Sequence, residues 1–261
     1  MTSLMEYLAL LAECVKYLAV SNGSKFLIAI VVGLALGVAG YWICSASSKL
    51  WNRSHHLRVG HHAMCAFAAF VTVLFTLVYV SADYMGEVAK AEIHGWQDQV
   101  SEDSDFQHEL FVRAFDGVSK SGIEDMTGVG NPRVDSSVTI PINKWESRIL
   151  VARIYSEGAL QNFADRHPYL DSSLDPGTSG PEDEIKQDLV NFFKGDPTAK
   201  MYPTERAVII ATSYLQSLAE EQLPGIESYT RRITLALFVV VQLFVFAMIS
   251  LAAHRSLTAT V

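Results

Sequence analysis

The sequence predicts a mainly α-helical, polytopic membrane protein with three transmembrane helices. Three uncharged apolar segments carry this prediction: Phe26 to Ala46, Ala63 to Ala82 and Ile233 to Ala253. A helix rises 1.5 Å per residue, so about 20 apolar residues cross the roughly 30 Å of hydrocarbon in a bilayer. A core helix of a soluble protein can also be apolar, but three such segments in a chain of 261 residues favour a membrane.

The composition excludes several classes of protein. Hydrophobic residues make up 50% of the chain and charged residues only 18%, against roughly 25% charge in soluble domains. The net charge of −8 argues against nucleic acid as a partner, because nucleic-acid-binding domains tend to be basic. Three cysteines are too few for a disulfide framework or a four-cysteine zinc site.

Residues 1–24 predict an amphipathic helix followed by a turn. Its apolar residues are spaced by four and three, as on one helical face: Leu4, Leu8, Leu11, Val15 and Leu18. The charges of Glu6, Glu13 and Lys16 make this segment unfavourable in hydrocarbon. We therefore expect a helix that lies at the outer membrane face or re-enters it; a fourth span is the alternative. The Ser-Asn-Gly-Ser sequence at 21–24 is typical of a turn.

Residues 25–82 predict a transmembrane hairpin with a basic cytoplasmic loop. The loop at 47–62 has no acidic residue and contains Lys49, Arg53 and Arg58. Because short cytoplasmic loops are enriched in Lys and Arg, this loop and the C-terminus, with Arg255, are expected inside the cell. Arg231 and Arg232 lie at the opposite end of the last span and count against this orientation without reversing it.

Residues 83–232 predict an acidic, mostly helical extracytoplasmic domain, and residues 233–261 the last span with a short cytoplasmic tail. The domain has 26 acidic and 14 basic residues, which gives a net charge of −12. A break or kink is expected at Pro224 and Gly225. The remaining expected elements are helices at 83–99, 106–118, 144–165, 181–193 and 203–222, loops at 122–131 and 171–181, and an extended segment at 137–142.

Four histidines in the cytoplasmic loop are candidate metal ligands: His55, His56, His61 and His62. Imidazole binds zinc, copper and iron. None of their separations is the i, i+4 spacing that brings two side chains together on a helix, so a metal site requires a looped conformation. The alternative is a polar loop at the lipid headgroups that is partly protonated below about pH 6.5.

The segment from Asp171 to Glu182 partly matches a calcium-binding loop. Side-chain oxygens fall at its positions 1, 3, 5, 9 and 12. Position 6 requires glycine for a sharp turn, and here it is Pro176, whose φ angle is fixed at negative values. An acidic surface loop is therefore the favoured interpretation.

Small and polar residues in the spans are candidates for helix packing. Gly33, Gly37 and Gly40 follow a GxxxG pattern, which lets helices approach closely within a chain or between copies. Gln242 is an amide in mid-span that needs a partner across a helix interface. Cys44 and Cys65 lie at similar depths, as buried packing residues or, alternatively, as a redox pair.

The sequence favours a non-catalytic function. The three spans contain no Asp, Glu, Lys or Arg, which proton relays and ion-coupled transporters use. The chain lacks HExxH, GxxxxGK[ST], GxSxG and CxxC. We expect a bacterial inner-membrane subunit whose acidic domain docks other subunits of a membrane complex or a second copy of the chain. The alternatives are a homo-oligomeric cation channel and a metal-binding membrane protein that uses the His55–His62 loop; no cofactor is indicated.

Overall fold

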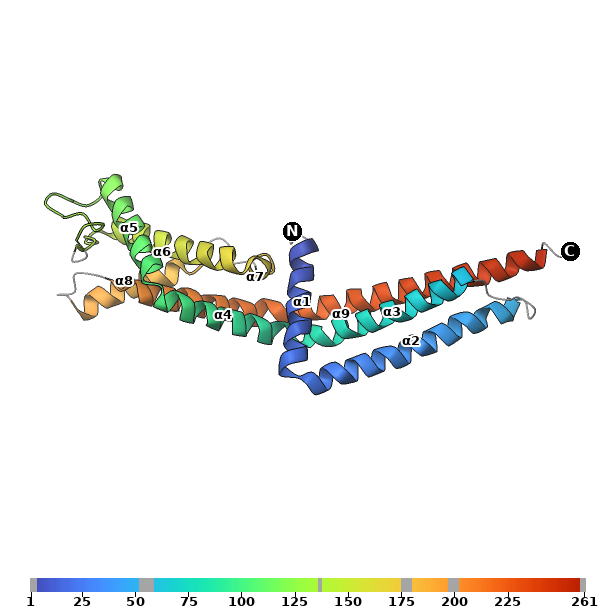
Figure 1. Ribbon diagram of the computed structural model, residues 1–261. Helices are drawn as coiled ribbons and strands as arrows, with labels where there is room; N and C mark the ends of the chain where they lie inside the picture. Colours follow the sequence, from blue (N-terminus) through green and yellow to red (C-terminus); the bar gives the residue numbers. More distant parts are fainter. Residues whose placement is uncertain (1–3, 52–58, 136–137, 175–179, 197–201, 259–261) are drawn as a thin grey trace. The chain divides into compact units, whose positions relative to one another are not determined.

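The computed structural model describes residues 4–51, 59–135, 138–174, 180–196 and 202–258. All regular secondary structure in these residues is helical, and none of them forms a strand (Figure 1). The chain divides into two compact units, which consist of residues 1–7 with 89–222 and of residues 8–88 with 223–261. The helical fold class is thus confirmed for the described residues, and the division by hydropathy stays a prediction.

Helices α1 (Leu4–Ser21) and α2 (Gly23–Trp51) are joined by a single residue, Asn22. The Asn22 N–H donates to the Leu18 carbonyl at 3.0 Å, and the Asn22 carbonyl accepts from the Phe26 N–H at 3.0 Å. Asn22 therefore satisfies an orphan carbonyl of one helix and an orphan N–H of the next. The predicted turn is confirmed.

The buried face of α1 coincides only partly with the apolar stripe of its sequence. Leu10, Leu11, Cys14 and Leu18 are buried, whereas Leu4 and Leu8 are 72% and 50% exposed. The sequence spacing shows where the apolar residues lie on the helix, but the helices that pack against α1 determine which of its faces is buried. Cys14 lies on this buried face as a small hydrophobic residue. Leu11 and Leu18 of the predicted stripe are thus buried, and the position of α1 at the membrane surface stays a prediction.

Three parts of the helical chain are long and apolar enough to cross a membrane: Gly23–Ala46, Val59–Glu102 and Arg206–Arg255. They belong to α2, to α3 (Val59–Ser81) with its continuation through η1 (Ala82–Tyr84) and α4 (Met85–Glu102), and to α9 (Thr204–Thr258). Their large apolar side chains are widely exposed, Ile28 at 61% and Val240 at 61% among them. Exposure on this scale indicates contact with lipid or protein rather than water.

Helix α9 continues through Pro224, so a break there is wrong, whereas the alternative, a kink, stays a prediction. A proline inside a helix removes one N–H donor and crowds the carbonyl four residues earlier. Here Leu223 and Thr230 are each 1% exposed, and the Thr230 hydroxyl donates to the Ile226 carbonyl at 2.7 Å. Packing on both sides of Pro224 therefore keeps the backbone helical where the local sequence favours a break.

The unit that contains residues 89–222 has its own hydrophobic core. It is built by α5 (Ser104–Ser121), α6 (Trp145–Arg166), α8 (Glu182–Gly195) and the first turns of α9, with the single turn α7 (Pro168–Asp171) after α6. These elements confirm the helices predicted near 106–118, 144–165 and 181–193. The core residues include Leu110, Phe115, Val151, Tyr155, Ile185, Leu189 and Ala207.

Residues 138–143 are neither helix nor strand. Val138, Ile140 and Ile142 are each 7–8% exposed and pack on the same core, while Thr139 and Pro141 between them are less buried. Burial at every second residue is typical of an extended backbone. Proline cannot donate to a strand ladder, and the segment accordingly lies extended without strand pairing.

We predict opposite effects for two glycine substitutions in this unit. A Cβ at Gly158 in α6 would lie 2.3 Å from Cδ1 of the buried Leu110, whereas a Cβ at Gly95 in α4 has nothing within 4 Å. Gly158→Ala should lower the free energy of unfolding by about 1–3 kcal/mol through overpacking. Gly95→Ala should raise it by about 0.5–1 kcal/mol. Unfolding followed by circular dichroism in mild detergent measures both; unchanged stability of Gly158→Ala would contradict this close α5–α6 packing.

Candidate functional site

Helices α2 and α3 approach closely at Gly33 and Gly37. A Cβ at Gly37 would lie 2.8 Å from the Ala69 carbonyl oxygen, and one at Gly33 would lie 3.1 Å from the Val73 Cα. Both glycines therefore face the α3 backbone, where a Cβ would collide at Gly37 and be tightly crowded at Gly33. The structure places these two residues of the predicted packing motif at an interface within one chain, as small residues in membrane helices allow.

Gln242 connects α9 to α3 beside the third glycine. Its Nε2 donates to the Thr72 Oγ1 at 2.9 Å and to the Ala68 carbonyl at 3.3 Å. A Cβ at Gly40 would lie 3.5 Å from the Gln242 Oε1. Gln242 thus finds the interhelical partners that an amide in an apolar helix needs. We call Gly33, Gly37, Gly40, Thr72 and Gln242 the glycine–glutamine seam.

Thr72 is the member of this seam that sequence reasoning missed. It is 2% exposed, and its hydroxyl donates to the Ala68 carbonyl at 2.8 Å while accepting from Gln242. Thr76, one turn further, donates to the Thr72 carbonyl at 2.8 Å. The available signal was two hydroxyl residues spaced by four in an otherwise apolar span, which places both on one helical face.

Cys44 and Cys65 pack in one small cluster with Ala68, Val245 and Ile249. Both are buried free thiols, as is Cys14. A buried free cysteine acts as a small hydrophobic residue. Their burial supports the packing interpretation, and the redox alternative stays a prediction.

The four loop histidines are only partly described. His55 and His56 lie outside the described residues, whereas His61 and His62 lie in the first turn of α3. The Tyr41 hydroxyl lies 2.7 Å from the His62 Nδ1, and the two rings stack with centroids 6.2 Å apart. Among the described residues no three His, Cys, Asp or Glu side chains converge as metal ligands. The metal site on this loop stays a prediction.

The calcium-loop candidate is also only partly described, because Asp175, Pro176 and Ser179 lie outside the described residues. Of the others, the Ser173 hydroxyl donates to the Tyr169 carbonyl at 2.8 Å. Glu182 lies 3.5 Å from the Arg153 guanidinium. These two side chains are engaged by neighbouring residues, which agrees with a surface loop.

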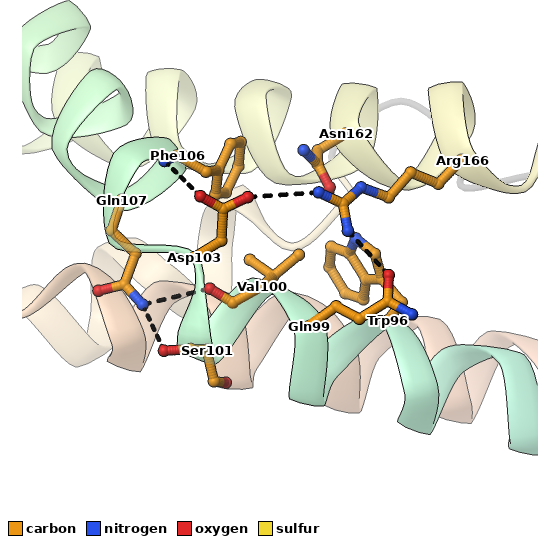
Figure 2. Close-up of polar contacts among 9 residues, drawn as sticks. All are labelled: Trp96, Gln99, Val100, Ser101, Asp103, Phe106, Gln107, Asn162 and Arg166. Atoms are coloured by element: carbon orange, nitrogen blue, oxygen red, sulfur yellow. Dashed lines mark hydrogen bonds and ion pairs between the residues drawn. The ribbon is translucent and has the colours of Figure 1, made fainter.

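Trp96 holds α4 against α6. Its indole Nε1 donates to the Asn162 Oδ1 at 2.9 Å (Figure 2). Its fully buried ring contacts Phe163 edge-on, with the ring centroids 5.4 Å apart. Arg166, one turn beyond Asn162, donates to the Gln99 Oε1 at 2.9 Å and lies 3.3 Å from Asp103. One face of α6 therefore holds α4 in two ways: Asn162 and Phe163 contact the buried Trp96, and the charged Arg166 binds Gln99.

The corner between α4 and α5 is fixed by two side chains. Asp103 accepts from the Phe106 N–H at 2.9 Å and so caps α5. The Gln107 amide donates back to the Val100 and Ser101 carbonyls at 3.2 and 2.9 Å (Figure 2). These bonds satisfy terminal groups of both helices, and the ion pair of Asp103 with Arg166 joins the corner to α6.

His167 lies at the junction of α6 and α7 against α4. Its Nδ1 is 3.1 Å from the Glu92 carboxylate, and its ring contacts Phe163 at 5.2 Å. Its Nε2 is buried and has no hydrogen-bond partner among the described residues. Burial lowers the pKa of His167, Glu92 partly opposes this shift, and Arg166 adds to it. The histidine therefore packs here as a neutral ring.

An acidic hollow of about 440 Å³ lies on α8 and α9. Arg206 binds the Asp188 carboxylate through two hydrogen bonds, 2.9 Å from Nε and 2.5 Å from a terminal nitrogen, and the Tyr202 hydroxyl donates to it at 2.5 Å. The hydrogen bonds from Arg206 and Tyr202 lower the pKa of Asp188 against the effect of burial. The hollow is lined by Asp183, Glu184, Gln187, Asp188, Asn191 and Ile210.

The chain matches no known protein family, no curated protein and no solved structure. Its function has to be inferred from its own residues. The described residues offer two arrangements with distinct chemistry, the glycine–glutamine seam in the membrane-length helices and the acidic hollow on α8 and α9.

We predict that the seam tolerates no added methyl group at Gly37. Gly37→Ala forces α2 away from the α3 backbone and should lower the free energy of unfolding by about 1–3 kcal/mol. Gly60→Ala is the matched control, because a Cβ there meets nothing within 4 Å. Thermal unfolding in mild detergent compares the two variants. Equal melting temperatures would show that the glycine does not determine this interface.

We predict that stability depends on pH through His167. Because its pKa is lower in the folded chain, the unfolded chain binds the proton more readily. The free energy of unfolding should therefore fall below about pH 6.5, by up to about 1.4 kcal/mol per pH unit. His167→Gln should reduce this pH dependence. The control is His108→Gln, at an exposed position of α5, which should leave the pH dependence unchanged. The free energy of unfolding is measured at pH 7.5 and 5.5. An equal decrease between these pH values for wild type and His167→Gln would refute the role of His167.

Proposed function

We propose that this chain is a non-catalytic integral membrane subunit whose acidic extracytoplasmic domain docks partner proteins. It serves as an accessory or assembly component of a membrane complex, in a bacterial inner membrane. The observation that carries the proposal is the acidic hollow on α8 and α9, which is open to the surface and lined by three carboxylates. Complementary charge at such a surface favours a basic segment of a partner.

The walls of the hollow are suited to this role. Asp188 is held by Arg206 and Tyr202, so that wall is preformed. Asp183 is 67% exposed, and among the described residues it forms an ion pair only with Lys186 of the same helix. Such a surface pair contributes little energy, so a partner cation can replace it. Residues 83–232 carry a net charge of −12, which speeds the approach of a basic partner.

The orientation rests on the distribution of cations. The loop at 47–62 and the C-terminal turn are basic, which supports a cytoplasmic position for both. Arg231, which counts against this orientation, forms an ion pair with Asp83 and is neutralised at that end of the span. In this arrangement α1 lies at the outer membrane surface, and its buried residues Leu10 and Leu18 face protein rather than lipid.

The seam favours an anchor over a pore formed between copies. Gly33 and Gly37 face α3 of their own chain, and Gln242 bonds to Thr72 of the same chain. The groups most suited to contacts between copies are therefore used internally. This is why we rank docking above the homo-oligomeric cation channel.

We predict that removing two carboxylates from the hollow releases the partner. In affinity purification of the full chain from native membranes in mild detergent, Asp183→Asn with Glu184→Gln should lower recovery of the associated protein about tenfold. Raised salt should have the same effect, because the charges are exposed.

The matched control is Glu146→Gln with Glu157→Gln, two exposed acids of α6 outside the hollow. The control should leave recovery unchanged. Equal losses in both double variants would assign binding to overall charge instead of the hollow. Recovery of the wild-type chain without any associated protein counts against the function itself.

A further inference from the structure

A second hollow lies among the membrane-length helices. It is a groove of about 350 Å³ between α2 and α9, with α3 as its floor. Val32 and Leu36 of α2, Thr76 and Val80 of α3, and Leu235 and Phe238 of α9 line it. The hydroxyls of Thr72 and Thr76 donate to carbonyls of their own helix, so the floor is apolar in chemical character.

The dimensions of the groove fit a hydrocarbon chain better than a helix. From Thr72 to Val80 it runs about 12 Å along α3, close to the roughly 15 Å of one membrane leaflet. A helix with side chains is about 10 Å wide, so 12 Å of it fills roughly 900 Å³. The groove offers about 350 Å³, which leaves room for a single acyl chain.

Basic residues lie beyond the end of the groove marked by Val80 and Thr234. Lys25 precedes Val32 by seven residues and Arg231 precedes Phe238 by seven, so each is on the groove side of its helix. The Lys25 Nζ lies 5.4 Å from the Tyr84 ring centroid. The Nε of Arg231 is buried and has no hydrogen-bond partner among the described residues. The Arg231 side chain as a whole is 37% exposed, so part of it is accessible at this end of the groove.

The nearby carboxylates are largely engaged. Asp83 pairs with Arg231, and Glu227 accepts from the Gly86 N–H at 3.3 Å. Lys25 and Arg232 form no ion pair with a described residue. The exposed Glu87 lies one turn beyond Asp83, so the rim carries both signs of charge. Because the rim carries both signs of charge, we expect its cations to bind the phosphate group of a lipid whether or not the whole headgroup has a net negative charge.

We propose that this groove binds one glycerophospholipid, with an acyl chain against α3 and the phosphate held by Lys25, Arg231 and Arg232. Arg231 contributes through the accessible part of its side chain while it keeps its ion pair with Asp83. This site goes beyond docking of a protein partner and is tested on the purified chain without one.

Two tryptophan substitutions on α9 test the groove. Leu235 and Leu237 are 56% and 49% exposed, and only Leu235 lines the groove. The full chain is purified in mild detergent, washed extensively, and analysed by native mass spectrometry for bound phospholipid. Wild type and Leu237→Trp should retain one lipid, and Leu235→Trp should retain about tenfold less. Equal retention by the two variants, or none by wild type, overturns the proposal.

A second comparison tests recognition of the phosphate. Lys25→Gln with Arg232→Gln should weaken retention about tenfold through loss of charge-assisted hydrogen bonds, and Lys49→Gln, on the last turn of α2, should not. Diacylglycerol with the same acyl chains should bind more weakly than the phospholipid by a similar factor. Equal retention of diacylglycerol refutes the phosphate site. Displacement of the lipid by inorganic phosphate would overturn the lipid proposal in favour of a site for free phosphate. Circular dichroism confirms that each variant is folded.

Discussion

The close approach of α2 to α3 at Gly33 and Gly37 is the contact on which the membrane unit depends. In hydrocarbon, apolar side chains gain nothing by leaving lipid for protein, so helices associate through close packing and interhelical hydrogen bonds. Glycine supplies the close packing here, since a Cβ at Gly37 would meet the Ala69 carbonyl. Gln242 supplies the hydrogen bonds through Thr72 and the Ala68 carbonyl. Together they join α2, α3 and α9 without any charged group.

The unit of residues 89–222 is held together in a different way, because burial of apolar surface from water is available to it. Its core is apolar, and polar groups fix the corners: Trp96 with Asn162, and Arg166 with Asp103. The exposed ion pairs contribute little energy individually. Their value lies in geometry, because Arg206 and Tyr202 set the position of Asp188 and thereby the shape of the acidic hollow.

The proposed functions divide between these two units. The hollow on α8 and α9 presents carboxylates to a protein partner, and the groove above Thr72 and Thr76 presents an apolar surface to one lipid chain. Arg231 is relevant to both the orientation and the lipid site. Its pairing with Asp83 offsets one cation at the end proposed to lie outside, and its partly exposed side chain contributes to the proposed phosphate contact.

The sequence by itself determined the helical class, the three membrane-length segments, the turn at Asn22 and the small-residue pattern of Gly33, Gly37 and Gly40. Each of these follows from hydropathy, periodicity or turn chemistry within a few turns of chain. Tertiary structure decided which face of α1 is buried, why α9 continues through Pro224, and that Thr72 receives Gln242. It also brought Tyr202 and Arg206 onto Asp188. These features depend on residues distant in sequence, and local pattern does not determine which distant surfaces pack together.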